Sequence, residues 1–173
     1  MADAVRICVW CEDREHERFA RELLAQLGVD RRRVRFQVAP SGRGSGSQWV
    51  VMQYATVCRQ ARAKRNQSNL GFLVVVDGDS DGRVQVAARL DAEAKRADDD
   101  RVAHWIPTWS IETWVLWLAG EDVTESVSFK HSCDFTALLR KAVAAWERPR
   151  SRESSDVPSL EAARSELERL PLK

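Results

Sequence analysis

Residues 72–81 contain the feature that most restricts the fold of this chain, an apolar run that ends abruptly in carboxylates. The run Phe72–Val76 is apolar throughout and is followed by Asp77, Asp79 and Asp81 at alternate positions. A short, wholly apolar run between glycines is typical of a strand buried on both faces of a parallel sheet. Because ligands of open α/β sheets bind beyond the carboxyl ends of the strands, these carboxylates are expected beside a ligand.

Carboxylates clustered at a strand tip repel one another unless a cation neutralises them. Hard, oxygen-ligated Mg2+ or Mn2+ meets that need. The alternative is an ordinary turn, in which Asp bonds its own backbone and Gly accepts a positive φ. Acids at the ends of neighbouring strands favour the metal site, and Glu12 and Glu112 are two such acids.

Hydrophobic periodicity predicts strands that alternate with helices along most of the chain. Strands are expected at Val5–Cys11, Val34–Val38, Phe72–Val76 and Val102–Ile106. Helices are expected at Asp13–Leu27, Gln48–Lys64, Val84–Ala97, Ile111–Leu118, Cys133–Trp146 and Ser159–Leu170. This alternation predicts an α/β, Rossmann-like fold with a mostly parallel four-stranded sheet flanked by helices. We expect residues 1–120 to form that domain and residues 121–173 to form a helical C-terminal extension, packed on it or on a partner.

The right-handed crossovers of such a fold place the carboxyl ends of the strands at one edge of the sheet. Glu12 follows the first expected strand, and Asp77 and Asp79 follow the third. The loop after Val34–Val38 and the segment after Val102–Ile106 occupy the corresponding places on the other two strands. We therefore expect these four segments to converge.

Composition and cysteine usage exclude several classes of protein. The 173 residues are 44% hydrophobic and 31% charged, with no run long enough to span a membrane and no signal-peptide pattern, so a soluble, cytoplasmic protein is expected. Four cysteines are too few for a disulfide scaffold at this length. Cys8 and Cys11 lie three apart in an expected strand and should point to opposite faces, which disfavours a shared metal. Cys58 and Cys133 are interpreted as small core residues.

The net charge of +1 conceals an asymmetry along the chain. Residues 1–65 carry 13 Lys/Arg against 7 Asp/Glu, and residues 66–122 carry 5 against 11. A basic segment beside an acidic one suits a protein that holds a polyanion next to a metal-loaded centre, although two solvated surfaces are the alternative. The residues expected to contact nucleic acid are Arg59, Arg62, Lys64 and Arg65 at the end of one helix, and Arg43 in the Gly/Ser-rich loop 40–47.

Histidine and tryptophan offer weaker signals. His16 lies four residues after Glu12, where contact with a ligand residue or a phosphate competes with the favoured interpretation, a surface histidine. Trp114 and Trp117 lie three apart on one helix and are interpreted as core. Trp109 precedes that helix and is a candidate for stacking on a base, with packing the favoured alternative.

The ordered acids resemble those of the Toprim domain, which topoisomerases, primases and the OLD (overcoming lysogenisation defect) nucleases share. The matching residues are Glu12 in Val-Trp-Cys-Glu, Asp77 and Asp79 in Val-Val-Asp-Gly-Asp, and Glu112 in Ile-Pro-Thr-Trp-Ser-Ile-Glu-Thr-Trp. The last segment is similar to the Pro-x-x-x-Ile-Glu-x-Trp stretch of small, stand-alone Toprim proteins related to the OLD nucleases. The resemblance covers residues 5–120. Where many Toprim domains have Gly after the first Glu, this chain has Asp13, which caps the helix or adds a ligand.

The resemblance implies a Toprim-like fold in which these acids hold one or two divalent cations during phosphodiester hydrolysis. It implies that Asp77, Asp79 and Glu112 are ligands of Mg2+ or Mn2+ and that Glu12 is a ligand or a general base. Asp81 is either a ligand held through water or a turn residue.

The expected activity is that of a Toprim-type endonuclease on nucleic acid, with DNA favoured over RNA. Its small size and lack of an ATPase domain suit the effector of a phage-defence or DNA-repair assembly, with an ATPase, another protein or a second copy as partner. Two other classes stay open: an inactive Toprim-fold binding protein, and a phosphatase or phosphotransferase with Asp77 as nucleophile. Neither fold class nor composition decides between them.

Overall fold

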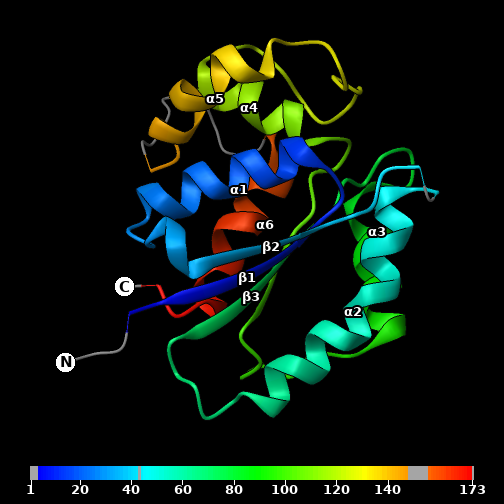
Figure 1. The fold of residues 1–173 in the computed structure, drawn as a ribbon. Helices are drawn as coiled ribbons and strands as arrows, with labels where there is room; N and C mark the ends of the chain where they lie inside the picture. Colours follow the sequence, from blue (N-terminus) through cyan, green and yellow to red (C-terminus); the bar gives the residue numbers. More distant parts are fainter. Residues whose placement is uncertain (1–3, 43, 148–155, 173) are drawn as a thin grey trace.

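The four strands form one parallel sheet. A computed structural model describes residues 4–42, 44–147 and 156–172 (Figure 1). Its strands are β1 (Arg6–Cys11), β2 (Val34–Val38), β3 (Leu70–Val75) and β4 (Val102–Trp105). They lie in the order β2-β1-β3-β4, and every neighbouring pair is parallel. The predicted α/β, Rossmann-like class with a four-stranded sheet is therefore confirmed.

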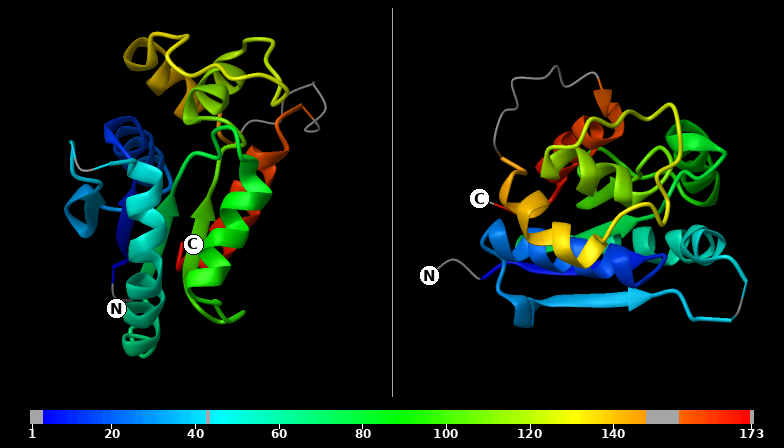
Figure 2. Two further views of the ribbon diagram at one scale, coloured as in Figure 1. Left: turned by 90° about the vertical axis from the view of Figure 1, so that its right-hand side faces the viewer. Right: turned by 90° about the horizontal axis from the view of Figure 1, so that it is seen from above.

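Helices cover both faces of this sheet. They are α1 (Arg14–Gln26), α2 (Gly46–Ala63), α3 (Gly82–Glu93), α4 (Ile111–Ala119), α5 (Phe135–Ala144) and α6 (Pro158–Glu166), with 3-10 turns at Arg31–Arg33 and Leu167–Arg169. The helices α2 and α3 lie side by side on one face, and α1 and α6 lie on the other (Figures 1 and 2). Within the described ranges, no helix combines the length and the apolar character needed to cross a membrane.

The alternation of side chains along β1 divides the apolar residues between two cores. Ile7, Val9 and Cys11 pack into the core that α1 covers, while Trp10 and the half-buried Cys8 face the core under α2 and α3. Cys8 and Cys11 therefore point to opposite faces, as the two-residue period of a strand predicts. The central strand β3 is buried along its whole length, which explains why its sequence is apolar without alternation.

Aromatic side chains fill the core on the α1 face. Phe19 packs against Trp105, Trp114 and Trp146, with ring centroids 6.1–6.2 Å apart. Trp114 and Trp117 are both buried, as predicted. The helices α5 and α6 contribute buried residues to this same core, so both pack on the α/β layer. Of the two cysteines interpreted as core, Cys58 is buried but Cys133 is only partly so, because it precedes α5 in a loop.

An ion pair covers the outer edge of β4. Arg96 Nη2 donates to Glu166 Oε1 at 2.8 Å, which joins the end of α6 to the segment before β4. The same two side chains reach the backbone of the strand: Arg96 Nη1 donates to the Val102 carbonyl at 2.7 Å, and Glu166 Oε2 accepts from the His104 N–H at 2.8 Å. Backbone groups that an edge strand would otherwise offer to another chain are thereby satisfied.

The imidazole of His104 is buried on the α2 face, where its Nε2 lies 2.6 Å from the Tyr54 hydroxyl. Burial, reinforced by the charge of Arg96, lowers the pKa of His104 to about 3. Folded His104 therefore stays neutral over a pH range in which an unfolded histidine, with a pKa of about 6.5, binds a proton. This histidine is structural, as expected for its place within a strand.

We predict that His104 makes the fold sensitive to mild acid. Because the unfolded state takes up the proton first, stability is full above about pH 7 and falls as the pH drops below about 6.5. Between pH 8 and pH 5 the loss from this residue is about 2 kcal/mol, a difference of roughly 1.5 pH units at about 1.36 kcal/mol each. Urea unfolding of the wild type and His104→Gln at both pH values measures it. A difference between the two chains that does not change with pH would contradict the prediction.

Candidate metal centre

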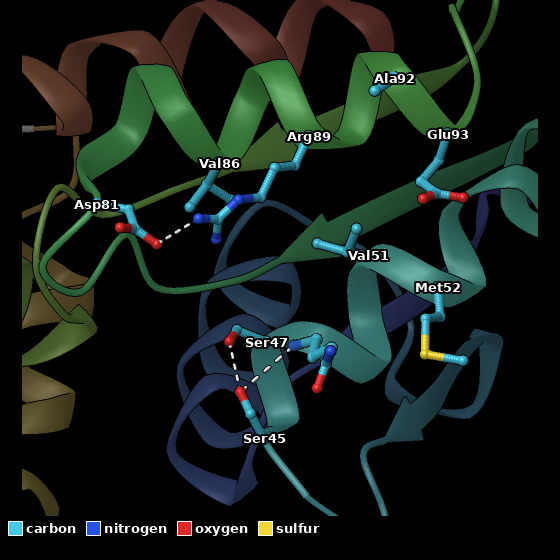
Figure 3. Close-up of a pocket in the computed structure, with 10 residues that line it drawn as sticks. Ser45, Ser47, Val51, Met52, Asp81, Val86, Arg89, Ala92 and Glu93 are labelled. Atoms are coloured by element: carbon cyan, nitrogen blue, oxygen red, sulfur yellow. Dashed lines mark hydrogen bonds and ion pairs between the residues drawn. The ribbon is translucent and has the colours of Figure 1, made fainter.

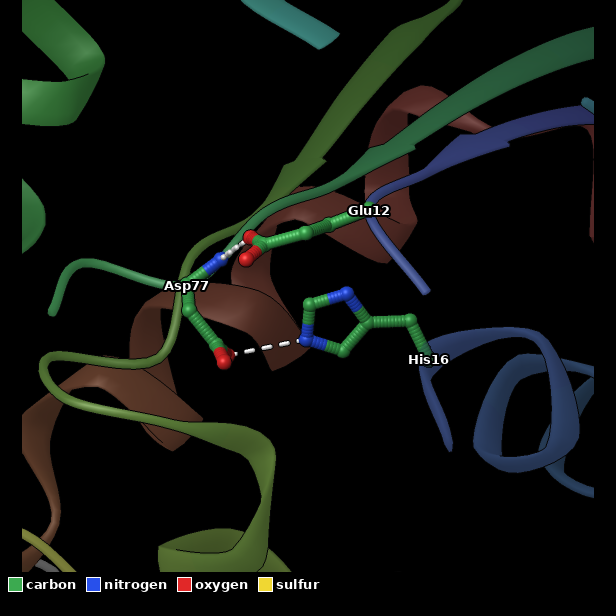
Figure 4. A group of neighbouring side chains, drawn as sticks. All are labelled: Glu12, His16 and Asp77. Carbon is green, nitrogen blue, oxygen red and sulfur yellow. Dashed lines mark hydrogen bonds and ion pairs between the residues drawn. The ribbon is translucent and has the colours of Figure 1, made fainter. Parts of the chain in front are cut away.

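The carboxyl edge of the sheet brings together Glu12, His16 and Asp77 (Figure 4). Glu12 follows β1, Asp77 follows β3, and His16 lies in the first turn of α1. One oxygen or nitrogen atom of each side chain lies within 4.8 Å of the other two. Two residues from the predicted set and one that was not in it thus form the most compact group of ligand atoms found in the described part of the chain.

Asp77 is the centre of this group. Its Oδ1 lies 2.8 Å from His16 Nε2 and accepts a hydrogen bond from the Ile111 N–H at 3.0 Å. Its backbone N–H donates to Glu12 Oε2 at 3.0 Å. The side chain is only 2% exposed. One aspartate therefore connects the ends of β1 and β3 to the first turns of α1 and α4.

The interpretation of His16 as a surface residue is wrong, because the structure buries its side chain completely. The cause lies at the start of α1, where Asp13 Oδ1 accepts the His16 N–H at 2.9 Å and caps the helix. With the cap in place, the i+4 spacing turns His16 toward the strand tips, on the side where Glu12 lies. Of the two roles weighed for Asp13, the structure shows the cap.

Burial governs the electrostatics of the group. Burial raises the pKa of Glu12 to about 7, against the opposing effect of His16. Burial lowers the pKa of His16, but the charge and hydrogen bond of Asp77 outweigh it and raise that pKa to about 9. For Asp77 burial raises the pKa, and His16 offsets part of the rise. Two carboxyls in so dry a position are stabilised by any added positive charge.

Asp79 lies at the rim of the group, and its side chain is 43% exposed. Its backbone has a φ of 47°, a left-handed conformation that the Asp79 N–H supports by donating to the Trp109 carbonyl at 2.9 Å. Lys130 Nζ donates to Asp79 Oδ1 at 3.0 Å and lies 3.8 Å from Asp77 Oδ2. Burial lowers the pKa of Lys130, but the two aspartates raise it by more than burial lowers it. The net effect is a raised pKa, so the ammonium stays charged.

Glu112 lies apart from the compact group, although it is in the first turn of α4 as predicted and is only 3% exposed. Its Oε1 accepts the His131 N–H at 3.0 Å. Glu15 is its acidic neighbour: burial and then the charge of Glu112 raise the pKa of Glu15. Glu112 thus lies between the loop 120–134 and α1, one residue beyond the N–H that binds Asp77.

Asp81 lines a different cavity. It forms an ion pair with Arg89 at 2.6 Å, and both residues line a pocket of about 630 Å3 between α2 and α3 from the α3 side (Figure 3). Ser45 and Ser47 line the same pocket at the start of α2, and Met52 and Val86 supply apolar wall. The structure therefore places Asp81 beside a cation of α3 and outside the compact group of Glu12, His16 and Asp77.

The predicted basic residues lie at the opposite edge of the sheet. Helix α2 starts with Gly46 against Glu12 and runs 18 residues, about 27 Å, to the amino edge. There Arg62 and Arg65 contact Asp100, at 3.3 Å and 3.4 Å, and Arg59 donates to Thr56. Lys64 is exposed at the end of the helix. Arg43 lies outside the described residues.

At the carboxyl edge, the predicted ligand set left out two basic residues, His16 and Lys130, although His16 was weighed for contact with a ligand residue or a phosphate. His16 carried a usable signal, because its i+4 spacing from Glu12 is visible in the sequence. Lys130 carried none: it lies in a loop with no strand before it, and only the fold brings it to Asp77 and Asp79. The candidate stacking residue Trp109 is half-buried, and its indole N–H donates to the Glu125 carbonyl at 3.0 Å.

Close backbone approach at Gly78 holds the strand tips together. The Gly78 N–H donates to the Pro107 carbonyl at 2.8 Å, and a Cβ atom at Gly78 would lie 2.2 Å from the Thr108 carbonyl oxygen. Only glycine allows the two tips to approach this closely.

We predict that Gly78→Ala destabilises the protein by about 2–3 kcal/mol, since backbone rather than a flexible side chain must move. Gly82→Ala is the matched control: it has a φ of 80° but no atom within 4 Å, so only strain of about 1 kcal/mol is added. Chemical denaturation of both variants measures the difference. Equal losses would show that crowding at Gly78 is unimportant.

Comparison with protein-family models, with curated proteins and with solved structures gives no match for this chain.

Proposed function

We propose that this protein is a divalent-metal-dependent nuclease whose metal is bound by Glu12, His16 and Asp77. The observation that carries the proposal is the compact group of ligand atoms, all within 4.8 Å of one another, at the carboxyl edge of a parallel sheet. The Toprim resemblance supplies the reaction class, phosphodiester hydrolysis. The role of Asp79 and Glu112 as further ligands is part of the same proposal.

The chemistry of the donor set fits a divalent cation. Two carboxyls and one imidazole are suitable ligands, and the Nδ1 of His16 is buried 3.8 Å from Asp13 Oδ1, too far for a hydrogen bond. Burial destabilises the ionised forms of Glu12 and Asp77 and so raises both pKa values, which means that a bound cation would stabilise the two carboxylates. Because the imidazole is a better ligand for transition metals than for Mg2+, Mn2+ is favoured over Mg2+.

A bound metal would supply charge neutralisation of the scissile phosphate and an activated water. The residues around it would divide the remaining work. Besides binding the metal, the Glu12 carboxylate would accept a proton from the attacking water. Asp77 would orient His16 through the contact at 2.8 Å. Lys130 would leave Asp79 to approach a phosphate oxygen, since its partly exposed amine lies 3.8 Å from Asp77 Oδ2.

The contacts of Asp77 weigh against the phosphatase alternative. A nucleophilic aspartate needs a free oxygen facing solvent, whereas Asp77 is 2% exposed and its Oδ1 is engaged by His16 and Ile111. The inactive binding protein stays an alternative, because Lys130 already offsets part of the acidic charge. Preference for DNA, a partner ATPase, a homodimer and a place in phage defence or DNA repair stay predictions of the resemblance.

A cleavage assay tests the proposed activity. Wild type is incubated with single-stranded, duplex and supercoiled DNA, and with RNA, in Mn2+, Mg2+ or EDTA. We expect cleavage that EDTA abolishes and that Asp77→Asn and Glu12→Gln each lower by about 10²–10⁴-fold, the range for loss of an acid–base group. Asp81→Asn is the control and should keep its activity, because Asp81 pairs with Arg89 instead. Full activity in Asp77→Asn or Glu12→Gln would overturn the assignment.

Thermal unfolding tests the metal site independently of turnover. Mn2+ at about 100 times its dissociation constant should stabilise the folded chain by about 2.7 kcal/mol. For a chain of this length that is a rise in Tm of roughly 5–10 °C. We expect the rise in wild type and in Asp81→Asn, a smaller rise with Mg2+, and none in Asp77→Asn. A rise that survives in Asp77→Asn would place the metal elsewhere.

A further inference from the structure

We propose that the flank of β2 beside the end of α2, formed by Arg6, Arg35 and Lys64, binds the phosphate backbone of the nucleic-acid substrate. The inference rests on the proposed function and adds to it the surface that holds the substrate. This surface is named the β2 flank below. It differs from the predicted basic site in its key residues: it includes Arg6 and Arg35 and leaves out Arg62 and Arg65.

Register places the cations of the β2 flank together. Arg35 on β2 pairs with Cys8 on β1, so the two side chains share the face that α2 covers further along the sheet. Arg6, two residues before Cys8, points to the same face. Burial raises the pKa of the Cys8 thiol, and Lys64, Arg35 and Arg6 all oppose that rise, which means that all three cations approach one side chain.

These cations are available to a ligand. Among the residues that the structure describes, Arg35 and Lys64 form no ion pair, and the Arg6 guanidinium donates only to the amide oxygen of Gln67 at 2.8 Å. All three are exposed. Arg62 and Arg65 differ, because both form ion pairs with Asp100 and Arg65 also lies 3.7 Å from Asp99. The cations near the end of α2 therefore form two sets. Arg62 and Arg65 are the paired set, and Arg6, Arg35 and Lys64 are the free set.

The basic turn before β2 extends the free set. Arg32 and Arg33 precede the strand, are exposed, and form no ion pair within the described ranges. Arg31 is held by Glu22 at 2.9 Å. Several unpaired cations around the start of β2, contributed by the basic turn, β1, β2 and the end of α2, match a ligand that repeats its negative charge, and a phosphate backbone is such a ligand.

The β2 flank leads to the metal centre. Strand β2 stays in register with β1 up to the pair of Val38 with Cys11, and the Ala39 N–H donates to the Cys11 carbonyl at 3.0 Å. The next residue of β1 is Glu12, so Arg35 lies about 13 Å from it, four strand residues at about 3.3 Å each. Beyond Ala39 the chain turns and returns at Gly46, which packs against Glu12. A nucleic-acid strand bound along β2 would thus extend to Glu12.

Binding measured without metal tests this inference apart from catalysis. Fluorescence anisotropy follows a labelled single-stranded oligonucleotide of about 20 residues in EDTA, at several salt concentrations. The test variant is Arg35→Gln/Lys64→Gln, and the matched control Arg62→Gln/Arg65→Gln removes the same charge from the paired set. If both cations contact phosphates, the slope of log affinity against log salt falls by about 1.4 in the test variant, and affinity falls several-fold.

The control should keep the wild-type slope and an affinity within about twofold of wild type. Equal effects of the two double variants, or no effect of the test variant, would overturn the proposal. So would the absence of binding by wild type to both single-stranded and duplex probes. Arg35→Glu, an exposed substitution, should weaken binding further, and thermal unfolding verifies that each variant folds. Binding that depends on the β2 flank, without metal-dependent cleavage, would support the binding surface and contradict the nuclease proposal. Metal-dependent cleavage that the test variant does not change would support the nuclease proposal and contradict the binding surface.

Discussion

Burial of the Asp77 carboxylate is the constraint on which the rest of this edge depends. An ionised carboxylate taken out of water is strongly destabilising unless charge and hydrogen bonds compensate it. Here the compensation comes from His16 on α1 and the Ile111 N–H on α4, while the Asp77 backbone positions Glu12. The start of each helix is therefore fixed by one side chain at the tip of β3. The same three contacts that hold the layers together also bring the ligand atoms to within 4.8 Å of one another.

Two cations, His16 and Lys130, already lie among the acids at this edge, and any added cation must compete with their charge. His16 is enclosed with Asp77 and cannot leave, so it either keeps its proton or becomes a ligand itself. Lys130 sits on an exposed loop against Asp79, where movement needs only the loss of a partly exposed ion pair, an interaction worth little in water. A divalent ion entering the site would therefore have to displace the proton of His16 and the ammonium group of Lys130.

The sheet was predictable because its strands differ from its helices in period. The wholly apolar sequence of β3 and the alternating sequence of β1 both predict strands, and the parallel crossovers then place Glu12 and Asp77 at one edge of the sheet. The sequence does not predict which of the acids at this edge lie close to one another. Glu112 follows β4 as predicted, yet its side chain turns to the His131 N–H, and Asp81 turns to Arg89, because those choices depend on loops and neighbouring helices. His16 was misjudged as a surface residue for the same reason: the Asp13 cap decides which way the first turn of α1 faces.

The ion pair of Arg96 and Glu166 along β4 makes the two borders of the sheet unequal. Side chains of the same chain bind the Val102 carbonyl and the His104 N–H of β4, while β2, the strand at the other border, carries no comparable pair among the described residues. A second copy that continued the sheet would therefore meet less obstruction at β2 than at β4. A two-fold axis there would pair the strands antiparallel, because an isologous contact matches the same surface on both subunits. The groups of Glu12, His16 and Asp77 in the two copies of such a dimer would then lie at opposite ends of one eight-stranded layer, each reached from its own side.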